Sequence, residues 1–159
     1  MLPLAQANID ANFGPSAARR IGTFALPRTA ELLWSATPAR GADGVDDAVH
    51  PPYDVVVMSD VLYRLDSVPL LVATLRWLCG PHTEVFKVYE LRNAEIEAAF
   101  HEQASRHFEV TPIAVGSFAD AGTTRRLESE LESPLRELRF YRMVLLHDEH
   151  GSDGNMWLR

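Results

Sequence analysis

The hydrophobic pattern along this chain predicts several strands separated by helices. Residues 53–60 read Tyr-Asp-Val-Val-Val-Met-Ser-Asp, a run that is continuously apolar at its centre. Such a run is typical of a strand buried on both faces, as in a parallel sheet covered by helices. Further strands are predicted at residues 85–89, 108–115 and 138–146, and Pro112 gives the second of these an edge or irregular position.

In three of the remaining segments the apolar residues recur at helical spacing, which predicts three helices. Residues 2–13 form the first predicted helix. Asp66 or Ser67 can cap a second helix that Gly80-Pro81 ends. Asn93 can cap a third, which we expect to run to about residue 107. The inward-facing positions predicted for this third helix are Ile96, Phe100 and Ala104.

The order of these elements predicts an α/β fold in which parallel βα units are followed by an antiparallel hairpin on the same sheet. A short strand is also expected at residues 21–26 and a short helix at 127–131. The polar segment 37–52 is predicted to be a loop insertion, and residues from 147 onward a flexible tail.

Composition and charge remove several classes of function. The net charge is −7 and the only adjacent basic pairs are Arg19-Arg20 and Arg125-Arg126, so we expect no nucleic-acid partner. No apolar run could span a membrane, so no membrane partner is expected. The single cysteine, Cys79, favours a reducing, cytoplasmic location and is read as a packing residue. His147 and His150 do not make a metal site, because the segment that holds them does not look helical.

Polar side chains gather where two buried strands end. Ser59, Asp60 and Tyr63 follow the first strand, and the run Tyr89-Glu-Leu-Arg-Asn93 follows the next. Open α/β sheets bind ligands outside the carboxyl ends of their strands, so this clustering favours a functional site. The residues alone leave another interpretation open, in which Asp60 is a loop residue and Glu90 and Arg92 form a surface ion pair.

Several short motifs follow one another along the chain: Asn8 with Asn12, Leu33-Trp34, Asp60-Val-Leu-Tyr63, Tyr89-Glu-Leu-Arg-Asn93 and Phe140-Tyr-Arg-Met143. Their order and spacing resemble those of one family, the small seven-β-strand (non-SET) protein-lysine methyltransferases of the methyltransferase family 16 type. The resemblance runs from Leu2 to about Leu146. It implies a Rossmann-like, S-adenosylmethionine-dependent methyltransferase sheet with helices on both faces.

The resemblance also implies roles for individual residues. Trp34 would pack beside the adenine of S-adenosylmethionine, and Ser59 would touch the cofactor. Asp60 and Tyr63 would shape the end of the pocket where the methyl group is transferred. Glu90 and Arg92 would form the lip of that pocket. The implied partner is a substrate protein that presents a lysine side chain, such as a chaperone or a translation factor.

The donor side of the expected cofactor site does not match the family. The nine glycines include no Gly-x-Gly turn, and the family's acidic ribose-binding residue would fall just before Met1. We therefore expect residues 1–146 to be a partial methyltransferase domain whose first strands are missing. The hypothesis that follows is that the chain binds the cofactor poorly or not at all, as an inactive fragment would. Two alternatives stay open: a non-catalytic interaction module derived from this fold, and a methyltransferase acting on histidine or a small molecule.

Overall fold

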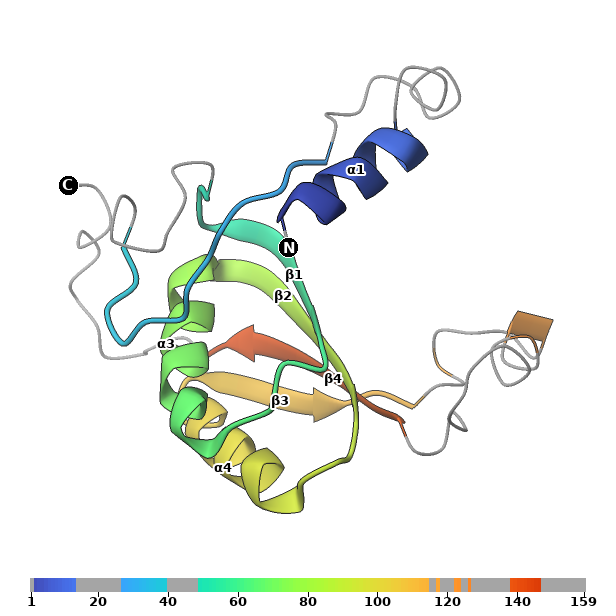
Figure 1. Cartoon of the computed structure of the whole chain (residues 1–159). Helices are drawn as coiled ribbons and strands as arrows, with labels where there is room; N and C mark the ends of the chain where they lie inside the picture. The colour runs from blue at the N-terminus through green and yellow to red at the C-terminus, as the bar shows by residue number, and fades with distance from the viewer. Residues whose placement is uncertain are drawn as a thin grey trace. The chain divides into compact units, whose positions relative to one another are not determined.

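A computed structural model describes residues 2–13, 27–39, 49–114, 117, 122–123, 126 and 138–146 of the 159-residue chain (Figure 1). The chain divides into two units, one formed by residues 1–33 and 38–50 and the other by residues 34–37 and 51–159. The predicted strand at 21–26, the predicted helix at 127–131, most of the loop insertion and the tail lie outside the described residues.

The first unit contains the helix α1, Leu2–Phe13, with the bounds that the sequence predicts. Hydrogen bonds across single turns support it: the Gln6 amide donates to Asp10 at 2.9 Å and the Asn12 amide donates to the Asn8 carbonyl at 2.7 Å. Residues four apart lie on the same face of a helix, which allows the bond between the Gln6 and Asp10 side chains and the bond from the Asn12 side chain to the Asn8 backbone. The Asn-x-x-x-Asn pair is thus tied together within the helix itself.

The second unit is built on a four-stranded sheet in the order β1-β2-β4-β3. The strands are β1 (Tyr53–Ser59), β2 (Cys79–Glu90), β3 (Phe108–Pro112) and β4 (Leu138–Leu145). β1 runs parallel to β2, whereas β4 is antiparallel to both β2 and β3. The predicted parallel unit and the antiparallel pairing of the last two strands are both present, and Pro112 lies on an outer strand, where its missing N–H costs least.

Two helices and a short 3-10 turn connect these strands: η1 (Leu65–Ser67), α3 (Val68–Leu78) and α4 (Ala94–Ala104). Asn93 caps α4 as predicted, because its side chain accepts hydrogen bonds from the backbone N–H groups of Glu95 and Ile96 at 3.0 and 3.2 Å. Ser67 precedes α3, but its hydroxyl donates to the Arg64 carbonyl and does not cap the helix.

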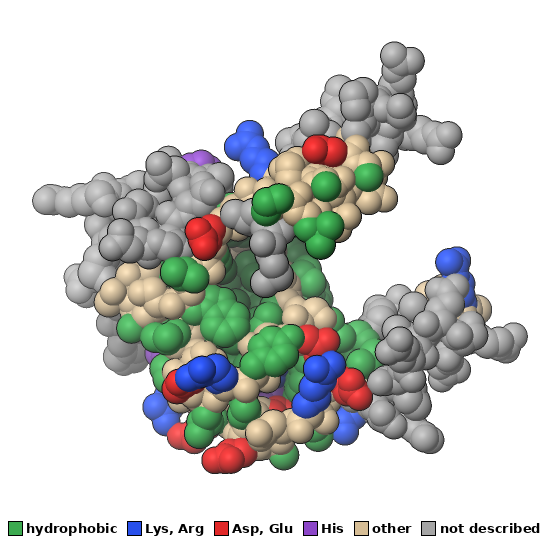
Figure 2. Space-filling model, in the orientation of Figure 1, with side chains coloured by type: hydrophobic (Ala, Val, Ile, Leu, Met, Phe, Trp, Pro, Cys, Tyr) green, Lys and Arg blue, Asp and Glu red, His purple; other side chains and the backbone are tan. Residues whose placement is uncertain are grey.

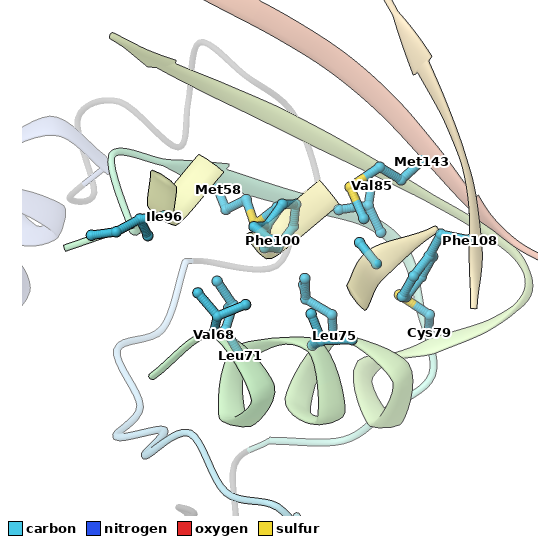
Figure 3. Close-up of a cluster of buried hydrophobic side chains, with 12 residues drawn as sticks. Met58, Val68, Leu71, Leu75, Cys79, Val85, Ile96, Phe100, Phe108 and Met143 are labelled. Atoms are coloured by element: carbon cyan, nitrogen blue, oxygen red, sulfur yellow. The ribbon is translucent and has the colours of Figure 1, made fainter. Parts of the chain in front are cut away.

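The core lies between the sheet and both helices, on one face of the sheet. Figure 3 shows Val68, Leu71 and Leu75 of α3 pointing towards Phe100 and the strands. Side chains that are fully buried here include Val85 of β2, Phe100 of α4 and Met143 of β4. Burial of such side chains is the main source of stability in a unit of this size. The three inward positions predicted for α4, namely Ile96, Phe100 and Ala104, all belong to this core.

The opposite face of β1 corrects one expectation. The apolar run was expected to be buried on both faces, yet Val55 is 51% exposed and Val57 is 70% exposed, while Met58 is buried. The reason is that α3 and α4 contact each other and pack on the same face of the sheet (Figure 1). A helix on the other face is not seen within the described part of this unit, so helices on both faces stay a prediction.

A second correction concerns the start of β2, after the end of α3. The helix stops at Leu78, just before Gly80-Pro81, as expected. The strand predicted at 85–89 starts earlier than expected, however, because β2 begins at Cys79 directly after the helix and includes the Gly-Pro pair. The Thr83 hydroxyl explains the early start of the strand, since it accepts from the Gly80 N–H at 2.7 Å and donates to the Tyr53 carbonyl of β1. None of the helices in the described ranges is long and apolar enough to cross a membrane.

Candidate functional site

The loop after β1 begins at a residue with an unusual backbone. Asp60 has a φ of +48°, in the left-handed region that few residues other than glycine adopt and in which asparagine and aspartate are the commonest exceptions. Its N–H donates to the Val88 carbonyl at 3.2 Å, and its carboxylate accepts from the Glu90 N–H at 3.4 Å. Asp60 therefore links the ends of β1 and β2. Sparsely populated backbone conformations of this kind concentrate at functional sites.

The segment after β2 brings its polar side chains to the same edge. Arg92 and Glu90 form an ion pair at 3.7 Å, in which the two side chains are 64% and 34% exposed. A pair this open to water contributes little to stability. Asn93 then caps α4, which begins at Ala94, so the cap fixes where this segment ends.

A pocket lies at this edge, over the carboxyl ends of the two parallel strands. Its empty space, including the open mouth, is about 310 Å³. The pocket is lined by Asp60, Leu62, Tyr63, Tyr89, Glu90, Arg92, Asn93 and Glu97. These residues carry three carboxyl groups and one guanidinium, so the lining is acidic overall. Figure 2 shows acidic and basic side chains close together on the visible face, with hydrophobic side chains among them.

The structure brings together four of the six residues predicted for the site. Asp60, Tyr63, Glu90 and Arg92, which were assigned to the acceptor end, all line the pocket. Tyr63 is 65% exposed, so its ring stands at the open side. The roles of these four residues remain predictions, but their convergence is a geometric fact.

The two residues predicted to contact the cofactor, Trp34 and Ser59, lie outside the pocket lining. Trp34 is half-buried and packs against the hydrophobic core, and the Ser35 N–H beside it donates to the Thr74 hydroxyl at 3.1 Å. Ser59 is exposed at the end of β1, directly before Asp60. Their contacts with S-adenosylmethionine therefore stay predictions. The described residues show no glycine-rich turn that would fit its methionine end.

One buried group at the pocket was not foreseen from the sequence. Lys87 of β2 is 2% exposed, and its Nζ lies 3.9 Å from the ring centroid of Tyr89 and 4.3 Å from that of Phe100. Burial lowers the pKa of this amine to about 8, and the Glu97 carboxyl opposes that shift. A lone charged residue within the apolar run Val-Phe-Lys-Val-Tyr was the signal available in the sequence, because lysine is seldom fully buried.

Glu97 was also missed, although it lies one turn into α4 from Asn93. It accepts a hydrogen bond from the Tyr141 hydroxyl at 3.5 Å, and its Oε1 is 3.5 Å from His101 Nε2. Burial, followed by the Lys87 charge, lowers the pKa of His101, whereas the charge of Glu97 and its hydrogen bond oppose that shift. Burial raises the pKa of Tyr141, and Glu97 adds to that effect.

Two other predictions about chemistry can be compared with the structure. Cys79 is buried in the core, and burial raises the pKa of its thiol to about 12, which fits a packing role. Within the described ranges, no group of three or more histidine, cysteine, aspartate or glutamate side chains could hold a metal ion. His147 and His150 lie outside those ranges.

A parallel strand pair with a polar pocket at its carboxyl edge defines an α/β protein whose pocket lies where that class typically binds ligands. Comparison with known proteins narrows the class. The model of a family described as lysine methyltransferase matches residues 29–108, half of the chain. The chain belongs to this lysine methyltransferase family, as its motifs indicate.

Two relatives carry the name EEF1A lysine methyltransferase 3. The Mus musculus protein is 31% identical over 105 residues, which cover 65% of this chain and 38% of the relative. The Xenopus tropicalis protein is 32% identical over 88 residues, which cover 55% of this chain and 32% of the relative. The chain thus spans about a third of the length of the curated relatives it matches.

Proposed function

We propose that this chain provides the lysine-binding side of an S-adenosylmethionine-dependent protein-lysine N-methyltransferase. The observation that carries the proposal is the convergence of Asp60, Tyr63, Glu90 and Arg92 on one pocket, in a chain of the lysine methyltransferase family. An acidic lining attracts a cationic lysine side chain from solution, and the tyrosine ring at the mouth offers a face for its aliphatic stem and its charge.

Asp60 has the most direct part in this proposal. Its carboxylate is held at the strand ends by the Glu90 N–H, which fixes its direction. It orients the incoming amine by a charge-assisted hydrogen bond and accepts its proton before transfer. Because a protonated amine has no free electron pair, loss of that proton must precede attack. Desolvation of the amine in the pocket favours this loss.

Trp34 and Ser59 are the residues that would hold the cofactor in this proposal. When bound, S-adenosylmethionine supplies a methyl group, and the amine nitrogen forms a bond to that carbon while the carbon–sulfur bond breaks with its electron pair going to sulfur. Trp34 would stack on the adenine ring and Ser59 would hydrogen-bond near it. The absence of a Gly-x-Gly turn from the sequence leads us to propose weak cofactor binding by the chain alone.

Calorimetric titration of the purified 159-residue chain with S-adenosylmethionine tests the last point. We expect binding weaker than micromolar. Micromolar binding would refute the proposed weakness and would show that the cofactor site does not depend on a glycine-rich turn.

The names of the relatives suggest the acceptor. Both are described as lysine methyltransferases of EEF1A, so we propose a protein of the translation-factor type as the substrate. The test is to incubate the chain with EEF1A and saturating deuterated S-adenosylmethionine and to locate the label by mass spectrometry. Labelled lysine is the expected result. Labelled histidine with unmodified lysine would overturn the choice of acceptor and favour the histidine alternative.

Two variants sharpen this assay. Asp60→Asn removes one of the three negative charges of the pocket and should lower the rate by about 10- to 100-fold, the value of a hydrogen bond to a charged group. Asp66→Asn is the matched control, because Asp66 follows the same strand but pairs with Arg64 in an exposed position. Equal rates for the two variants would exclude Asp60 from the reaction. Absence of transfer by the unmodified chain at saturating cofactor would favour the non-catalytic interaction module.

A further inference from the structure

Lys87 is the only lysine among the 159 residues, and it is 2% exposed. All other basic side chains, apart from the histidines, are arginines. A lysine that is fully buried needs a partner for its charge, since transfer of an ammonium ion from water to a protein interior is costly. Lys87 Nζ has no hydrogen-bond partner within the described part of the chain.

Aromatic rings take the place of hydrogen-bond partners around this amine. Its Nζ is 3.9 Å from the centroid of Tyr89, 4.3 Å from that of Phe100 and 5.2 Å from that of Tyr141. The rings of Tyr89 and Tyr141 are stacked, with centroids 6.2 Å apart and planes within 18°. Faces of aromatic rings attract cations, and more strongly in a desolvated site. Three elements, β2, α4 and β4, therefore build one cage around a single ammonium group.

The cage shares a wall with the pocket. Tyr89 and Glu97 both line the pocket, and both act on Lys87, Tyr89 through its ring and Glu97 through its charge. The Lys87 ammonium is thus one side chain away from the space in which the acceptor amine would lie. On the same side of the sheet, β1 contributes the apolar Met58 and α3 contributes apolar residues, so neither adds a charge to the cage.

We propose that Lys87 is a positioning residue whose ammonium group, held behind the pocket wall, favours the neutral form of a lysine amine bound in the pocket. This inference rests on the proposed function, because it assumes that the pocket takes up a lysine. The lining carboxylates of Asp60, Glu90 and Glu97 attract the lysine but also stabilise its charged, unreactive form. A positive charge close behind them opposes the second effect.

The other ionisable groups facing Lys87 allow this role. On α4 they are Glu97, whose charge attracts the ammonium, and His101, whose pKa is lowered by burial and by the Lys87 charge itself. On β4 Tyr141 donates its hydroxyl to Glu97, and Arg139 adds a further positive charge near Tyr141. Two unit charges about 8 Å apart, at an effective dielectric constant of about 20 to 40, shift each other's titration by about one pH unit.

The coupling is reciprocal, so a cation in the pocket must lower the titration midpoint of Lys87. The chain's single lysine gives one side-chain signal in a sample labelled only in lysine, which makes the midpoint measurable by NMR. The cationic probe is Nα-acetyl-trimethyllysine N-methylamide, whose charge does not titrate. The matched neutral probe is Nα-acetylnorleucine N-methylamide.

We expect the cationic probe at saturation to lower the Lys87 midpoint by about one pH unit, and the neutral probe to leave it unchanged. In the Lys87→Met variant, the cationic probe should bind about 10-fold more tightly at pH 7, because the opposing charge is gone. Methionine suits the cage, as a flexible apolar side chain that aromatic rings accept.

Two results overturn the inference and are distinguishable. If resonances of Asp60 and Tyr63, followed in a second, uniformly labelled sample, move with the cationic probe while the Lys87 midpoint stays constant, the pocket binds cations but Lys87 has no influence on it. The proposed function then survives. If neither probe disturbs the pocket resonances at any concentration, both the inference and the proposed lysine-binding function are wrong.

Discussion

Replacement of Lys87 by methionine should stabilise the protein at neutral pH. Burial lowers the pKa of Lys87 from 10.5 to about 8. The buried ammonium group is therefore less stable in the folded chain than in the unfolded chain, and below pH 8 this charge destabilises the fold. A difference of this size corresponds to about 3 kcal/mol of folding free energy. Methionine removes this cost together with the favourable contacts between the charge and the rings, which are worth about 1 kcal/mol. We expect a net gain of about 2 kcal/mol for Lys87→Met at pH 7.

The sign of the pH dependence follows from the same pKa. Between pH 8 and 10.5 the unfolded chain binds the lysine proton and the folded chain does not, so the stability of the unmodified protein rises with pH across this window. Below pH 8 both states hold the proton, and the cost is constant. The advantage of the methionine variant should therefore be constant below pH 8 and should shrink as the pH rises towards 10.

Urea unfolding followed by tryptophan fluorescence measures this difference, when the two proteins are compared at pH 6, 7, 8, 9 and 10. Arg106→Met is the matched control, because it also removes one positive charge, but from an exposed side chain. Arg106 forms an exposed ion pair with Glu102, four residues earlier in the chain. Its effect should be within about 0.5 kcal/mol at every pH. A Lys87→Met protein that is less stable at pH 7, or whose advantage does not change between pH 7 and 10, would refute the reasoning.

Three further predictions concern single positions. Asn93→Ala removes the cap of α4 and should lower the free energy of unfolding in urea by about 1 kcal/mol, most of which Asn93→Asp should restore. Equal stability of all three proteins would contradict the capping of the Glu95 and Ile96 N–H groups. Asp60→Gly should be more stable than Asp60→Ala by about 1 kcal/mol, because only glycine tolerates a positive φ without strain; alanine performing as well would show that the backbone is unstrained there. Cys79, which is buried and has a raised thiol pKa, should react with Ellman's reagent at pH 8 only after unfolding in urea, and rapid reaction of the folded chain would argue against burial.

Elements whose limits depend on local sequence were predictable. The helix at residues 2–13 has its predicted bounds, and Asn93 caps α4 as its side-chain chemistry suggests. The start of β2 was not predictable, because it depends on a distant contact. The Thr83 hydroxyl bridges the Gly80 N–H and the Tyr53 carbonyl of β1, thirty residues earlier in the chain, and extends the strand over a Gly-Pro pair that locally favours a turn.

The candidate site divides in the same way. Asp60, Tyr63, Glu90 and Arg92 follow strand ends, and a parallel pair of strands brings such residues to one edge, so their convergence could be inferred. The role of Lys87 could not be inferred from the sequence. Its place in an apolar strand indicates burial, but the aromatic rings that surround it come from α4 and β4 as well as from β2. Only the packing of those elements shows that a charge is caged behind the pocket.

Val57 illustrates how an apolar pattern can mislead. The continuous apolar run of β1 predicts burial on both faces, whereas Val57 is 70% exposed and Met58, its neighbour, is buried. A run of this kind records which residues can be buried, not how many layers pack against the strand. The packing of α3 and α4 on a single face of the sheet decides which half of the run enters the core.

The central claim is that the pocket at the carboxyl ends of β1 and β2 receives a lysine side chain. The most direct test is to record intermolecular NMR contacts between the 159-residue chain and a short peptide that contains a single lysine. We predict contacts from the lysine ε-methylene group to the Tyr63 ring, and their loss when norleucine replaces that lysine. Contacts from the lysine to any other surface, or an unchanged pattern with norleucine, would contradict the account.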